Sequence, residues 1–119
     1  MDVASRFLDA IARRDFDAIG ACFSEDAAFR VLTPHQLREL AGRDEIAGRF
    51  RAWFGGLESF ALVDSDVAPV ADRVRIRWHT RGSDPEQGPR ENDHTGYAEI
   101  EDDRIVALNA SCAGFRSTA

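Results

Sequence analysis

A histidine at position 94, in the run Asp93-His94-Thr95-Gly96, is the strongest candidate for chemistry in this sequence. An imidazole titrates near neutral pH and can act as a general acid or a general base. On a strand, Gly96 would share the face of His94 and leave room there for a ligand. We therefore predict His94 as a catalytic residue. The alternative is a strand-end histidine that is only solvated or hydrogen-bonded, because one isolated ionisable group is a weak signal.

Four other side chains are predicted to contact a bound molecule: Trp53, Trp78, Tyr97 and Cys112. Two indole rings facing a hollow would stack on a flat, apolar ligand, although Trp53 also fits plain core packing. The Tyr97 phenol would either hydrogen-bond a ligand carbonyl or lie on the outer face. Asn109 and Cys112 have opposite phases on the last strand, and we expect Cys112 to face inward.

The other ionisable groups are expected to face outward. A bulge would turn Trp78 and His94 inward and leave His79 outside. Asp64 and Asp66 alternate within an apolar strand, and we expect them to face solvent; the opposite register would make them candidate bases. Two histidines without a third ligand at useful spacing do not make a metal site, so we predict neither metal nor cofactor.

The composition describes one ordinary globular domain covering residues 1–119. The apolar fraction is 44% and the charged fraction is 30%. A net charge of −6 argues against nucleic-acid or anionic-membrane surfaces. All 15 basic residues are arginine, so lysine chemistry such as Schiff-base formation is excluded.

The two cysteines, Cys22 and Cys112, make no disulfide framework and are expected to be buried thiols. The start of the chain lacks a basic leader and an apolar stretch of signal length, and no later segment has about 18 consecutive apolar residues. These features predict a cytoplasmic protein.

Helical patterns dominate the first half of the chain. One helix is predicted from Val3 to Arg13, and a second follows with Asp15 as its cap. A strand is expected over residues 27–33. The run Thr33-Pro34-His35-Gln36 then predicts a short helix, and residues 44–54 form the clearest helical pattern.

Strand patterns fill the second half, over residues 58–67, 73–81, 91–100 and 104–115, with a polar loop over 82–89. This order predicts an α+β fold. We expect three N-terminal helices packed on the concave face of a strongly curved, mainly antiparallel sheet. Such a cone-shaped α+β barrel would enclose a cavity.

Five runs together resemble the nuclear-transport-factor-2-like superfamily, and within it the SnoaL-like group. They are FLDAIARRDFDAIGACFSEDAAF, GRDEIAGRFRAWF, RVRIRWHTRG, HTGYAEIEDDRI and IVALNASCAGF. The resemblance covers nearly the whole chain. It implies the cone fold and a homodimer, but no particular reaction, because this fold hosts isomerases, cyclases, hydrolases and proteins without chemistry.

The catalytic groups of the steroid-isomerase relatives are absent from the matching positions. Their tyrosine corresponds to Phe7, their base aspartate to Val31, and their second acid falls at Thr95 or Gly96. Epoxide-hydrolase relatives use a last-strand aspartate that would fall at Ala110. Polyketide-cyclase relatives pair a histidine, matched by His94, with a last-strand aspartate. At that place the chain has only Leu108, Asn109 and Ala110.

Two functional hypotheses result. The first is a SnoaL-like enzyme, a cofactor-free isomerase, cyclase or hydrolase that acts on a compact apolar substrate through His94. The second is a non-catalytic module of the same fold that binds a small ligand or only dimerises. A second ionisable group converging on His94 would favour the enzyme.

Overall fold

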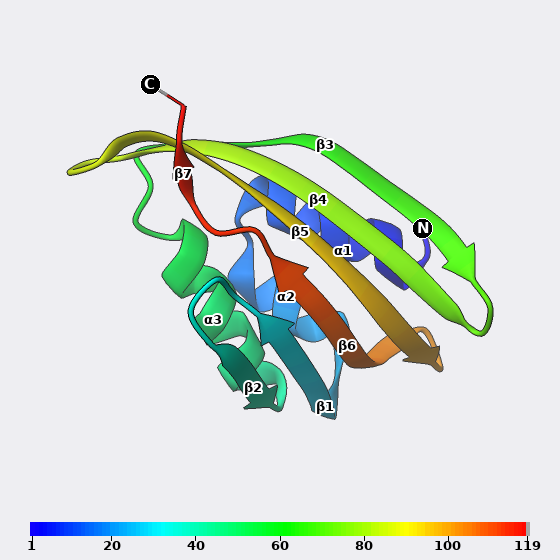
Figure 1. Cartoon of the computed structure of the whole chain (residues 1–119). Coiled ribbons are helices and arrows are strands. Elements are labelled where there is room, and N and C mark those ends of the chain that lie inside the picture. Colours follow the sequence, from blue (N-terminus) through cyan, green and yellow to red (C-terminus); the bar gives the residue numbers. More distant parts are fainter. Residues whose placement is uncertain (119) are drawn as a thin grey trace.

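The computed structural model describes residues 1–118 and contains three helices and seven strands (Figure 1). The helices are α1 (Val3–Arg13), α2 (Phe16–Ala21) and α3 (Arg43–Phe54). The strands are β1 (Phe23–Leu32), β2 (Leu37–Ala41), β3 (Ser59–Val70), β4 (Arg73–Asp84), β5 (Gly88–Glu101), β6 (Arg104–Cys112) and β7 (Arg116–Ser117).

Side-chain caps and one left-handed residue set the boundaries of the first two helices. The Asp2 carboxylate accepts a hydrogen bond from the Ser5 backbone N–H at 2.9 Å, which caps α1. Arg14, with φ 51°, ends that helix. Asp15 then caps α2 by accepting from the Ala18 N–H at 3.1 Å, which confirms the predicted cap.

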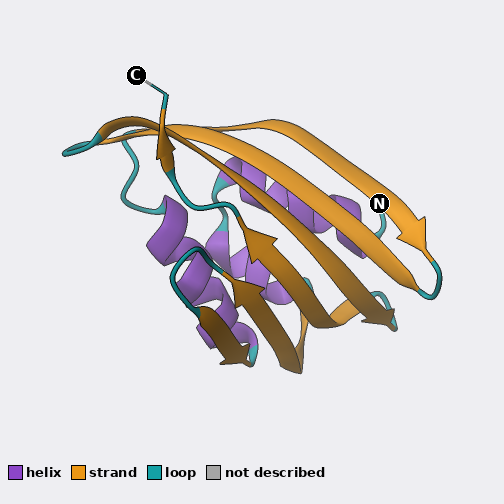
Figure 2. Cartoon of the chain, viewed as in Figure 1, coloured by secondary structure: helices purple, strands orange, loops and turns teal. Residues whose placement is uncertain are grey.

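The strands form one curled sheet that does not close into a complete barrel. Its order is β2-β1-β6-β5-β4-β3, and β7 pairs with β5 beside this path. Neighbouring strands are antiparallel except β1 and β6, which are parallel. All three helices lie on one side of the sheet (Figure 2). The predicted α+β fold with a curved, mainly antiparallel sheet is confirmed.

Aromatic rings fill the space between the helices and the sheet. The Phe7 ring meets Phe23 and Phe50 at centroid distances of 5.7 Å each, and it meets Trp78 at 5.3 Å. Phe29 stacks on Phe50 at 5.8 Å. These rings are fully or almost fully buried. The concave side is therefore a packed core in the region where the sequence predicted an open hollow.

The short helix predicted after Thr33 is wrong. Residues 33–36 make a tight turn, and β2 then pairs antiparallel with β1. The Gln36 N–H does bond the Thr33 hydroxyl at 3.2 Å, as it would at a helix start. The Thr33 N–H, however, bonds the Gln36 carbonyl at 2.9 Å, so the chain reverses. His35 is exposed in this turn, and Leu37 is 48% exposed.

The polar loop predicted over residues 82–89 is also wrong, because β4 and β5 continue to a turn at residues 85–87. The ladder between them has an unbroken register that places Trp78 opposite His94. Both side chains face inward and His79 faces outward, as predicted. The two-residue alternation of a straight ladder achieves this without a bulge.

Candidate functional site

His94 lies at the centre of a cluster of rings on the inner face of β5. Its imidazole is stacked on Trp78, with centroids 5.0 Å apart and planes 8° from parallel. The Trp53 ring lies 4.7 Å away and Phe54 lies 6.4 Å away. The residue is 1% exposed. Helix α3 supplies two of these contacts, because Trp53 and Phe54 are the last two residues of this helix. Strand β4 supplies the third contact through Trp78.

Neither ring nitrogen of His94 has a hydrogen-bond partner within residues 1–118. Burial lowers the pKa of His94 to about 3, and the negative charge of the adjacent Asp93 opposes this only in part. The imidazole is therefore neutral at pH 7, with one N–H donor and one acceptor nitrogen. It can exchange hydrogen bonds with a ligand, but at this pKa it is a weak base.

Three polar side chains lie near His94 on the inner face: Thr80, Asn92 and Cys112. Cys112 is directly opposite His94 in the β5–β6 register, and Thr80 is opposite Asn92 in the β4–β5 register. The Asn92 amide meets the Cys112 sulfur at 3.4 Å. Sequence reasoning missed Thr80 and Asn92. The alternation that sends His94 inward also sends Asn92 inward, so the signal was present.

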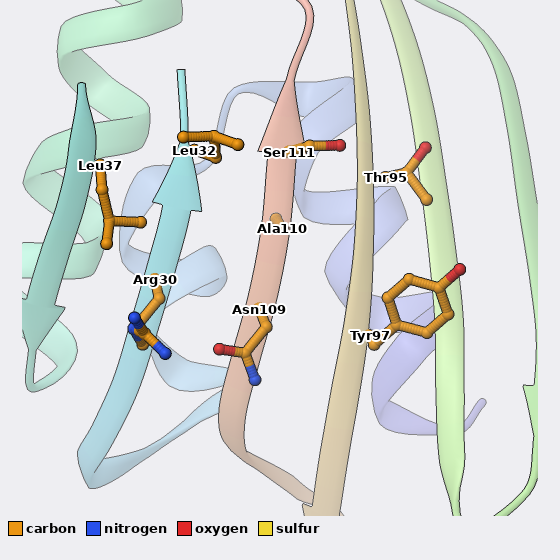
Figure 3. A pocket seen from close by; sticks show the side chains of 8 residues that line it. All are labelled: Arg30, Leu32, Leu37, Thr95, Tyr97, Asn109, Ala110 and Ser111. Carbon is orange, nitrogen blue, oxygen red and sulfur yellow. The ribbon is translucent and has the colours of Figure 1, made fainter. Parts of the chain in front are cut away.

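Tyr97 and Asn109 lie on the opposite side of the sheet from His94. Both line a shallow hollow over β2, β1, β6 and β5 (Figure 3). Tyr97 is 40% exposed, and its phenol is not part of the His94 cluster. Cys112 faces inward, as the sequence predicted, and it is 7% exposed.

The space above Gly96 is already filled. A Cβ atom at this position would lie 2.7 Å from the Leu108 Cδ1 atom and 3.2 Å from the Ala110 Cβ atom. Leu108 is fully buried. The expectation that Gly96 leaves room for a ligand is therefore wrong, because β6 packs directly against it.

An open cleft of about 400 Å³ lies beside the ring cluster. It is bordered by the β1–β2 turn, by the chain just after β6 and by the end of α3, which lie close together (Figure 1). Its lining is Thr33, Pro34, His35, Gln36, Arg38, Trp53, Cys112, Ala113, Gly114 and Phe115. Trp53 contacts His94, and Cys112 lies opposite His94 on the adjacent strand. These two side chains therefore separate the cleft from the buried imidazole.

His79 belongs to a cluster of charges on the outer face of the sheet. Its ring nitrogens lie 2.7 Å from Asp93 and 3.3 Å from Glu91. Arg116 contacts the same two carboxylates at 3.1 Å each. The basic neighbours hold the pKa values of Asp93 and Glu91 below their usual range, against the effect of burial. This cluster fastens β7 to β5.

The remaining predicted acids are separate from His94. Asp64 is exposed, and the Asp66 carboxylate pairs with Arg75 at 3.0 Å. Within residues 1–118, no group of three or more histidine, cysteine or acidic side chains has a geometry that could hold a metal ion. In the same range, no helix has the length and apolar character needed to cross a membrane.

Comparison with known proteins gives a consistent family and fold. The family model described as the SnoaL-like domain matches residues 4–108. Comparison with curated protein sequences gives no match.

Solved structures share the fold at low sequence identity. One is a Catenulispora acidiphila protein with a ketosteroid isomerase-like fold, solved with trimethylamine; it has a TM-score of 0.74 and 15% identity, over 91% of this chain and 82% of that one. A presumed polyketide cyclase from Xanthomonas campestris has a TM-score of 0.72 and 19% identity, over 92% and 86%. Bal32a, from a soil-derived mobile gene cassette, has a TM-score of 0.73 and 18% identity, over 97% and 87%.

Proposed function

The chain belongs to the SnoaL-like domain family, and from this premise we propose that it binds a compact, largely apolar molecule beside His94. The strongest support for this proposal is the environment of the His94 imidazole. The imidazole is almost completely buried and surrounded by aromatic rings, and neither nitrogen has a hydrogen-bond partner in the described part of the chain. A bound molecule with one polar group would supply the missing partner.

The energetic argument rests on the cost of burying unpaired polar groups. Each buried donor or acceptor without a partner costs about 1–3 kcal/mol, and such groups are rare in native proteins. A phenylalanine would fill the same aromatic space without this cost. The retained imidazole is therefore better explained by a binding role than by packing.

Access to His94 would come from the cleft that Trp53 and Cys112 line. Trp53 is only partly buried, and its ring lies between the open cleft and the imidazole. A change of its side-chain rotamer would expose the imidazole to the cleft. A ligand would then contact the indole, the Cys112 thiol and His94 together.

The catalytic form of the proposal is cofactor-independent isomerisation, cyclisation or hydrolysis, with His94 as the proton carrier. The Cys112 thiol opposite His94 favours it as a second ionisable group on the inner face. The pKa of about 3 favours binding over catalysis, because a general base works best when its pKa lies near the working pH. Catalysis would require a ligand that raises this pKa.

We further propose that the chain forms a homodimer through the outer face of the sheet. The hollow over β2, β1, β6 and β5 is bordered by exposed apolar side chains, namely Leu32, Leu37 and Tyr97 (Figure 3). A second copy would cover these groups. A location in the cytoplasm stays a prediction from the sequence.

Calorimetric titration with cyclohexanone tests the binding proposal. Cyclohexanone is apolar and carries one acceptor oxygen, which the His94 N–H would bond. We expect H94F to bind at least about ten-fold more weakly than the wild type, as the loss of one hydrogen bond to a buried group implies. H79Q, which changes the outer histidine, should bind like the wild type. Equal affinity of H94F and wild type, or no binding by the wild type, would reject the proposal.

A further inference from the structure

Two arginines near the cleft have no acidic partner in the part of the chain that the structure describes. Among residues 1–118, Arg38 on β2 and Arg49 on α3 take part in no ion pair and donate no hydrogen bond, although both are partly buried. Arg77, on β4, is the one other arginine in this range without such a partner. In a chain with 21 acidic residues, carboxylate partners are abundant, so two unpaired neighbours require an explanation.

The environment of Arg49 is unfavourable for a cation. Its Nε atom is buried and has no hydrogen-bond partner among the described residues. Burial lowers the pKa of Arg49, and the positive charge of Arg38 lowers it further. A compensating contact comes from Trp53, because the guanidinium carbon lies 5.5 Å from the centroid of that ring. The two guanidinium groups therefore repel each other in a place that water reaches only in part.

The cleft connects these charges to the ring cluster. Arg38 lines the cleft directly. Trp53 also lines it, and the Arg49 guanidinium lies over the Trp53 ring. None of the residues that line the cleft is acidic. The volume of about 400 Å³ suits a small organic molecule. An anion in this position would offset the repulsion between the two arginines.

We propose that the cleft binds the oxyanion of an otherwise apolar molecule, a carboxylate or a phosphate, between Arg38 and Arg49. Planar guanidinium groups match the geometry of both oxyanions and bind them through paired N–H donors. The apolar body would pack on Trp53 and point toward His94. This part rests on the proposed function, whereas the anion site depends on the two arginines alone.

Three probes with the same cyclohexane ring test the anion site: cyclohexanecarboxylate, cyclohexyl phosphate and the neutral cyclohexanecarboxamide. We expect calorimetry to show that at least one anionic probe binds the wild type ten-fold or more tightly than the amide. R49Q and R38Q should each remove most of this preference. R77Q, which removes the unpaired arginine of β4, should keep it. High salt should weaken binding of the anionic probe more than that of the amide.

The outcomes separate this inference from the proposed function. Comparable binding of all three probes, or an equal loss in R77Q and R49Q, overturns the anion site while the binding proposal remains. Absence of binding by every probe overturns the anion site, and the cyclohexanone titration then decides the binding proposal separately. Thermal melting of R49Q without ligand supplies a second readout. We expect its melting temperature to equal or exceed that of the wild type, because the substitution removes a repulsion, and a large decrease would show that Arg49 is structural.

Discussion

The imidazole of His94 is well packed, but its two nitrogens have no hydrogen-bond partner within residues 1–118. Its ring lies parallel to Trp78 and gains contacts there, but its nitrogens face apolar groups. Protonation would place an unpaired charge in this core, which is why burial lowers the pKa to about 3. The residue therefore couples the stability of the fold to pH.

We predict that His94 destabilises the fold progressively as the pH falls below about 6.5. In the unfolded chain the histidine protonates near pH 6.5, whereas in the folded chain it stays neutral down to about pH 3. Between these values the unfolded state binds more protons, so the free energy of unfolding decreases with decreasing pH. At pH 5 this loss amounts to about 2 kcal/mol.

Urea unfolding of wild type and H94F at pH 7 and pH 5 measures this effect. We expect the stability difference between the two proteins to shift by about 2 kcal/mol in favour of H94F at pH 5. A difference that does not change with pH would mean that His94 is solvated or paired in solution. At pH 7 the variant should be at least as stable as the wild type, since it removes two buried polar atoms that have no partner within residues 1–118.

At the scale of elements, the inner faces of β5 and β6 pack without spare volume. Gly96 is the point of closest approach, because Leu108 and Ala110 occupy the space where a side chain would begin. Gly48 differs in this respect. It lies on the exposed side of α3, and a Cβ atom there would meet nothing within 4 Å.

These two glycines make a matched pair of substitutions. Gly96→Ala should destabilise the protein by about 1–3 kcal/mol, as overpacking of a filled core does. Gly48→Ala should stabilise it by about 0.5–1 kcal/mol through helix propensity. Thermal or urea unfolding compares both with the wild type. A neutral effect of Gly96→Ala would mean that the Leu108 side chain can move away from Gly96 at little cost.

Local sequence signals predicted most of the helices and strands. They failed after Thr33, where a helix start and a tight turn share the same sequence signal. The Thr33 hydroxyl bonds the Gln36 N–H in this turn as it would in a helix cap. Only the pairing of β2 with β1, which is a tertiary contact, decides against the helix. The same error hid the proximity of two arginines, because it is strand β2 that brings Arg38 near Arg49.

The alternation of side chains along a strand predicted which site residues point inward. It could not predict how completely the space around them is filled. A two-residue period places Trp78, His94 and Cys112 inward and Tyr97 outward. No sequence pattern shows that Phe7 and Phe50 reach Trp78 and fill the hollow. The distances between rings depend on how three helices settle against a curved sheet.

At the scale of the whole molecule, the two faces of the sheet differ in character. The inner face is covered by helices, whereas the outer face exposes Leu32, Leu37 and Tyr97 around the hollow of Figure 3. Exposed apolar side chains gathered around one hollow favour an interaction site. The proposed homodimer would bury them.

Sedimentation analysis of the wild type and L37E tests this assembly. We expect the wild type to sediment at twice the mass of one chain and L37E to sediment as a monomer, because a buried carboxylate would have no partner in the interface. V70E should remain dimeric, since Val70 is exposed on β3 but does not line the hollow. A monomeric wild type would reject the dimer.

The parallel contact between β1 and β6 has a consequence for how the chain folds. These two strands join the N-terminal part of the sheet to the rest, and they lie far apart in the sequence. The entropy of closing so long a loop must be overcome before this contact forms, which slows folding. Until β6 inserts, Phe23 and Phe29 lack the neighbouring strand of their sheet. Partly folded chains would thus carry an unpaired strand edge on β1, and such an edge can pair with another chain and promote aggregation.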